Sequence, residues 1–278
     1  MQYLALFLWF SLCLLLGALL FKVMRGPLSY RFLGMLSIPG IVIRKFSQTV
    51  AALLCAANVT DVKIYETDPR DITFETSGIG RIATLVVPLA PLFGSVLALG
   101  VLNSILGEPM HFAYAPPPLS SLDAGGLKGF VEGVGLLMSG LVRQTFQGDH
   151  TSPEFYVMLV LIFSLALGAC QPIQKLREAF LGVGMLVVVL ALLSGLVIPA
   201  GGMGPIKNAI ASPGKAAYMV AGVRSFMVNC AGMAFALMLF GMLEAAVVGV
   251  LVRIYEMITG ASTSSEGSSS MNTSARRA

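Results

Sequence analysis

The sequence predicts an all-α polytopic membrane protein with about six transmembrane helices and a small β-hairpin after the second. Of its 278 residues, 56% are hydrophobic and only 12% are charged, whereas ordinary globular proteins carry about 25% charged residues. The apolar residues gather in charge-free runs of about 20 residues, which is the length that a helix needs to cross a bilayer. This composition excludes a soluble enzyme and a disordered protein, and the scattered basic residues exclude a nucleic-acid binder.

Six apolar segments are expected to span the membrane. They are 2–21, 32–57, 82–107, 155–174, 179–199 and 225–252. The first is interpreted as a retained helix rather than a signal peptide, because its basic residues Lys22 and Arg25 follow the apolar run instead of preceding it. A short charged turn separates the fourth and fifth spans, which are therefore expected to pack as an antiparallel hairpin.

Helix-breaking residues occur inside two of these spans. Pro88 and Pro91 are expected to kink the span 82–107, because proline removes a backbone donor. The span 32–57 is interrupted by Pro39-Gly40. Both segments are therefore predicted to be irregular helices.

The connections differ in character. Residues 61–76 alternate between apolar and polar side chains around Asp68-Pro69, which predicts an amphipathic β-hairpin. Residues 127–146 predict a helix that lies at the membrane interface. The Ser/Thr-rich tail 261–278 is expected to be disordered, so residues 1–260 form a single transmembrane bundle.

A motif in the second span carries a family resemblance. Pro39-Gly40 and three apolar residues precede Arg44, Lys45 and Gln48, and the predicted hairpin follows. This arrangement resembles the signature of the site-2-protease-like membrane zinc metalloproteases, in which Pro-Gly and three apolar residues precede H-E-x-x-H. In such a motif the two histidines bind zinc and the glutamate is the general base.

The residues at the motif positions cannot perform that chemistry. Arg44 and Gln48 stand at the two histidine positions, and Lys45 stands at the glutamate position. Guanidinium has no lone pair to offer, protonated ammonium is no base, and an amide is a poor zinc ligand. Asp123, in Leu122-Asp123-Ala124-Gly125, matches the aspartate that is the family's third zinc ligand. The resemblance therefore implies a shared fold, a degenerate former motif, and neither catalytic residues nor a metal or other cofactor.

Two placements remain open for the mid-span cations Arg44 and Lys45. In the first, both residues lie at the membrane interface or extend their long side chains so that the charged ends reach it. In the second, they lie in the protein interior as counter-charges to a carboxylate such as Asp123, Glu132 or Glu244. Arg224 and Glu244 bracket the last span and are further candidates for interior polar or partner contacts.

The expected function is that of a catalytically inactive, protease-like integral membrane protein. It would act as a structural, assembly or regulatory subunit that binds other integral membrane proteins, with lipid around it and no nucleic acid. The alternative is a transporter or channel component, and an active intramembrane protease ranks last. The expected location is multi-pass in a bacterial inner membrane, with the orientation open because the two faces carry equal numbers of basic residues.

Overall fold

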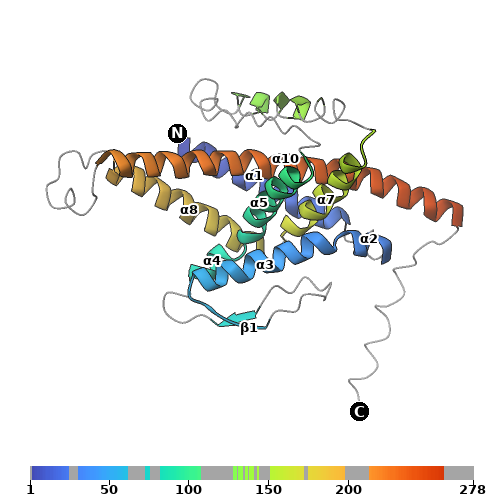
Figure 1. Cartoon of the computed structure of the whole chain (residues 1–278), viewed down its shortest axis with the longest axis horizontal. Helices are drawn as coiled ribbons and strands as arrows, with labels where there is room; N and C mark the ends of the chain where they lie inside the picture. Colours follow the sequence, from blue (N-terminus) through green and yellow to red (C-terminus); the bar gives the residue numbers. More distant parts are fainter. Residues whose placement is uncertain are drawn as a thin grey trace, which may run out of the picture.

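The structure is a computed structural model that describes residues 2–24, 31–61, 73–75, 82–107, 151–171, 175–197, 213–259 and most positions between 128 and 143. Within these ranges the chain is mostly helical, as predicted (Figure 1). In chain order the elements are α1 (Gln2–Met24), α2 (Arg31–Leu36), α3 (Ile38–Leu54), β1 (Asn58–Asp61), β2 (Thr73–Glu75), α4 (Ala83–Val86), α5 (Ala90–Ile105), α7 (Pro153–Ala169), α8 (Leu176–Val197) and α10 (Pro213–Thr259).

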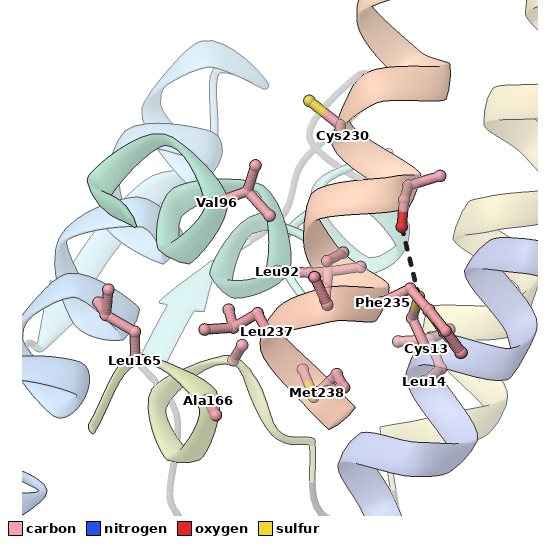
Figure 2. Close-up of a cluster of buried hydrophobic side chains, with 14 of the residues drawn as sticks. Cys13, Leu14, Leu92, Val96, Leu165, Ala166, Cys230, Phe235, Leu237 and Met238 are labelled. Carbon is pink, nitrogen blue, oxygen red and sulfur yellow. Dashed lines mark hydrogen bonds between the residues drawn. The ribbon is translucent and has the colours of Figure 1, made fainter. Parts of the chain in front are cut away.

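The longest helix, α10, is the centre of the bundle. Its 47 residues extend over about 70 Å at 1.5 Å per residue. No position between Cys230 and Gly241 is exposed, because α1, α5, α7 and α8 all pack against α10. Figure 2 shows part of this core, where Cys13 Sγ donates a 3.9 Å hydrogen bond to the carbonyl oxygen of Ala231. The ring of Trp9 lies edge-on to that of Phe235, with 5.0 Å between centroids.

In the part of the chain that the structure describes, two helices, Tyr3–Met24 and Gly222–Thr259, are long and apolar enough to cross a membrane. That criterion concerns length and composition alone, and a buried core helix or an N-terminal signal sequence can also meet it.

Several predicted helix boundaries are wrong for local reasons. The span 32–57 is divided at Ser37 and ends at Leu54. The span 155–174 ends at Ala169, because the residue before Pro172 disfavours helical geometry. The span 225–252 is part of a much longer helix, because Pro213 is compatible with a first helical turn and the helix runs on to Thr259.

The antiparallel hairpin expected of the fourth and fifth spans is also wrong. From α7 to α8 the residue numbers rise while the numbers of the neighbouring α1 residues fall. Ala166 and Leu20 both lie against Gly241. Cys170 then lies beside Gly17, and Gly184 lies beside Phe7. The two helices therefore follow one another in the same general direction instead of packing side by side.

The remaining helix directions follow from similar contacts. α1 and α10 are parallel, since Cys13 contacts Ala231 and Gly17 contacts Met238. α3 packs parallel to α7, since Gly40 bonds to Ser164 and Arg44 bonds to Cys170. It packs antiparallel to α5, since the earlier Ser47 of α3 lies beside Gly94 and the later Ala51 lies in the same cluster as Ala90. Figure 1 shows α5 and α7 between α3 and α10.

A short antiparallel pair of strands follows α3, as expected, but its first strand begins before residue 61. Asn58 pairs with Glu75 and Val59 with Phe74. Ala56 adopts a left-handed backbone conformation with φ 54. It lies in the short turn between the end of α3 and the start of β1. The expected turn at Asp68-Pro69 lies outside the described residues.

Two other connections were predicted. The described positions between 128 and 143 are helical, and the side chains of Val131 and Leu136 are exposed. The tail 261–278 lies outside the described residues.

Glycines allow α3 and α7 to cross at backbone contact. A Cβ built on Gly40 would overlap the backbone of Ser164, and one built on Gly168 would overlap that of Gly40. The pair therefore fixes how closely the two helices approach.

We predict that Gly168→Ala destabilises the protein by about 1 to 3 kcal/mol, because the added methyl group forces α7 away from α3. Gly222→Ala is the matched control: it also lies in a helix, but no atom lies within 4 Å of its added Cβ. Thermal unfolding in detergent would compare the two variants. Equal stability of both would contradict the close crossing.

Candidate functional site

Helix α3 carries its polar face inward and its apolar face outward. Arg44, Lys45 and Gln48 are only 7%, 5% and 0% exposed. The exposed positions of α3 carry no polar side chain: apart from Pro39 in the first turn, they are the large apolar residues Ile38, Val42, Phe46, Val50, Leu53 and Leu54. Arg44 and Lys45 therefore lie among the packed helices rather than on their outer surface.

Arg44 caps the end of α7. That helix stops at Ala169, and Cys170 adopts an extended conformation with φ −64 and ψ 141. The last carbonyl groups of a helix lack intrahelical donors, and the helix end carries partial negative charge. Arg44 Nη1 donates to the carbonyl oxygen of Cys170 over 2.9 Å. A buried cation is thus held against the negative end of a buried helix.

Ser164 caps the beginning of α3 in return. The backbone N–H of Gly40 lies in the first turn of α3 and donates to Ser164 Oγ over 2.8 Å. Ser37, the local N-cap residue, makes no such bond, since its hydroxyl donates to the carbonyl of Gly34. Helices α3 and α7 therefore cap one another.

Gln171 connects the end of α7 to the break between α4 and α5. Its Nε2 donates to the carbonyl oxygen of Pro88 over 2.6 Å. This carbonyl lies at the proline-rich break, where the backbone N–H of Leu92 bonds to Leu89 instead. Gln171 is 1% exposed, and its Oε1 has no hydrogen-bond partner in the described part of the chain. We call Arg44, Lys45, Gln48, Ser164 and Gln171 the polar junction.

The structure does not place the acidic residues considered above as a group around Arg44 and Lys45. Asp123 lies outside the described residues. Glu132 is exposed, with Lys128 Nζ 3.8 Å from its Oε1, so it lies at the surface rather than opposite Arg44. Arg224 and Glu244 are not brought together, because twenty positions of one helix separate them by about 30 Å.

The residues of the polar junction do not fit a zinc ion. The guanidinium at the first histidine position donates a hydrogen bond and offers no lone pair. Among the described residues, no group of three His, Cys, Asp or Glu side chains could hold a metal ion. What the junction does supply is hydrogen bonding between helix ends.

No protein-family model, curated protein or solved structure matches this chain.

Sequence reasoning missed two members of the polar junction, Ser164 and Gln171, and the Cys170 carbonyl that Arg44 binds. Gln171 carried a usable signal, since a polar residue directly before Pro172 marks a helix end inside an apolar segment. Ser164 carried none, because a single serine in an apolar run is equally typical of ordinary helix packing.

We predict that Arg44→Ala lowers the free energy of unfolding by about 3 kcal/mol, because it strands the buried Cys170 carbonyl and removes a charged hydrogen bond. Arg44→Lys keeps the charge and should recover part of the loss. Arg253→Ala, which removes an exposed arginine from α10, should change stability by less than about 0.5 kcal/mol. Denaturation in detergent measures all three, and a neutral Arg44→Ala would contradict the capping role.

Proposed function

We propose that this chain is an integral membrane protein without protease activity, related in fold to the intramembrane zinc proteases, that binds another membrane protein as a structural, assembly or regulatory subunit. The hydrogen bond from Arg44 to the Cys170 carbonyl carries the proposal. A cation that ties two helices together stands where the resembled family has a metal ligand. The chemistry of this position therefore favours a structural brace over a catalytic centre.

The inverted polarity of α3 supports placement in lipid. In water, exposed positions such as Phe46, which is 67% exposed, would favour polar residues, and Lys45 would lie outside. In a bilayer the preference is reversed, because ionisable side chains face the bundle interior and apolar side chains meet the hydrocarbon. α1, α5, α7, α8 and α10 likewise expose large apolar side chains.

The helix directions favour five crossings over the six that composition predicts. Each crossing of the membrane reverses the direction of the chain. Since α1 and α10 run parallel, the number of crossings from α1 to α10 must be odd. This number results if α7 and α8 together form one broken crossing after α1, α2–α3 and α4–α5. The break carries Lys175, Arg177 and Glu178, of which the last two are exposed, so it would need contact with water.

We predict that Ser139→Cys and Lys215→Cys are labelled from opposite sides of the membrane. Five crossings place the α5–α7 and α8–α10 connections on opposite faces, whereas six place them on the same face. A membrane-impermeant maleimide on sealed vesicles, before and after permeabilisation, distinguishes the two. The partly exposed Cys55 would be replaced by serine, since Cys13, Cys170 and Cys230 are buried. Labelling from the same side would contradict the broken crossing.

We also predict that the purified protein holds far less than one zinc ion per chain and leaves the membrane as part of a larger assembly. Elemental analysis after removal of adventitious metal tests the first expectation. Native mass measurement in a mild detergent tests the second. Stoichiometric zinc would contradict the inactive site, and a solitary monomer would contradict the subunit role.

A transporter or channel component is the second candidate, and one observation favours it. Two helix breaks, at Pro88 and at Cys170, face each other inside the bundle through Gln171. Discontinuous helices of this kind supply ion or substrate sites in many transporters. Solute flux in proteoliposomes would separate this candidate from a subunit without transport activity.

A further inference from the structure

The face by which α10 packs in the bundle continues past the other helices, and no described element covers it there. Leu237, Phe240 and Gly241 on this face are buried. Further along the same face lie four large side chains at helical spacing, Val247, Leu251, Tyr255 and Ile258, which are 60%, 59%, 56% and 79% exposed. Figure 1 shows this end of α10 extending beyond the rest of the bundle. We call these four residues, with Glu244, the α10 extension.

Glu244 lies where the buried part of this face gives way to the exposed part. The residue is half-buried, and its Oε2 is buried with no hydrogen-bond partner among the described residues. Leu243 beside it is 49% exposed, so the position can be reached from outside the bundle. An unpaired carboxylate among apolar groups is unfavourable, and a cation brought to it would relieve that cost.

We propose that the α10 extension binds a transmembrane helix of a different protein that carries a lysine or arginine at the level of Glu244. The apolar side chains supply helix packing, and the carboxylate supplies the selectivity. This inference rests on the proposed role as a membrane subunit, and it specifies the docking surface and the chemistry of the partner.

A second copy of the chain does not satisfy Glu244. Copies inserted in the same direction would set Glu244 opposite Glu244, which is a like-charge pair. The nearest basic residue along α10, Arg253, is nine positions away, which is about 14 Å along the axis and on the opposite side of the helix. Lipid tails would cover the apolar residues but offer no donor to the carboxylate.

The test uses a synthetic transmembrane helix of leucine and alanine with one central lysine, and a matched peptide with leucine there. Energy transfer between peptide and full-length protein is measured in phosphatidylcholine vesicles. The lysine peptide should bind at least tenfold more tightly, and Glu244→Gln should abolish this preference. Glu256→Gln is the matched control, because Glu256 lies on the same helix but about 120° around it, and it should keep the preference.

Two further variants test each half of the surface. Leu251→Ala should weaken both peptides, whereas Val250→Ala, 57% exposed on another face of the helix, should not. Glu244→Lys should reverse the selectivity toward a peptide with a central glutamate, which keeps the test decisive if Glu244→Gln folds poorly.

Equal binding of the lysine and leucine peptides to the wild-type protein, or equal losses in Glu244→Gln and Glu256→Gln, would overturn the proposal. Binding of neither peptide would assign the surface to lipid. Energy transfer between two labelled copies without peptide would assign it to self-association. Any of these results, combined with a large native assembly in mild detergent, would reject this docking surface but would still support the role as a membrane subunit.

Discussion

Backbone groups that are freed inside an apolar bundle must find partners within the protein, and this requirement organises the structure. α7 ends and α3 begins in the interior, and the chain between α4 and α5 is broken there. Each unsatisfied buried group would cost about 1 to 3 kcal/mol. Arg44, Ser164 and Gln171 supply the missing donors and acceptor. The close crossing of α3 and α7 makes these bonds possible, so packing and hydrogen bonding depend on one another.

A guanidinium and a divalent metal share the sign of their charge but differ in what they do at a buried site. The metal accepts electron pairs from several side chains, whereas Arg44 donates hydrogen to a backbone carbonyl. A fold that loses its metal ligands can therefore keep positive charge at the same depth and still hold two helices together. On the proposed relationship to zinc proteases, such a substitution would preserve the architecture and remove the reactive centre.

The sequence predicted what depends on local pattern and missed what depends on pairing between distant segments. The apolar runs predicted the helical class, because hydropathy is a local property. The prolines predicted the irregular helices around Pro39 and Pro88, because a missing backbone donor also acts locally. The reciprocal caps from Ser164 and Arg44 depend on which helices become neighbours, which no single segment specifies. The short charged turn after α7 suggested a hairpin, yet a break of a few residues also allows the chain to continue in nearly the same direction.

The parallel packing of α1 on α10 also has a consequence for biosynthesis. Cys13 bonds to Ala231, 218 positions later in the chain. At about 5 to 20 residues per second, the ribosome would need roughly 10 to 45 seconds to make the segment between them. Throughout that interval the faces of Trp9 and Cys13 that α10 finally covers would meet lipid or another protein. Helix α1 therefore completes its contacts long after its own synthesis, and factors that shield nascent membrane segments would act on it during that interval.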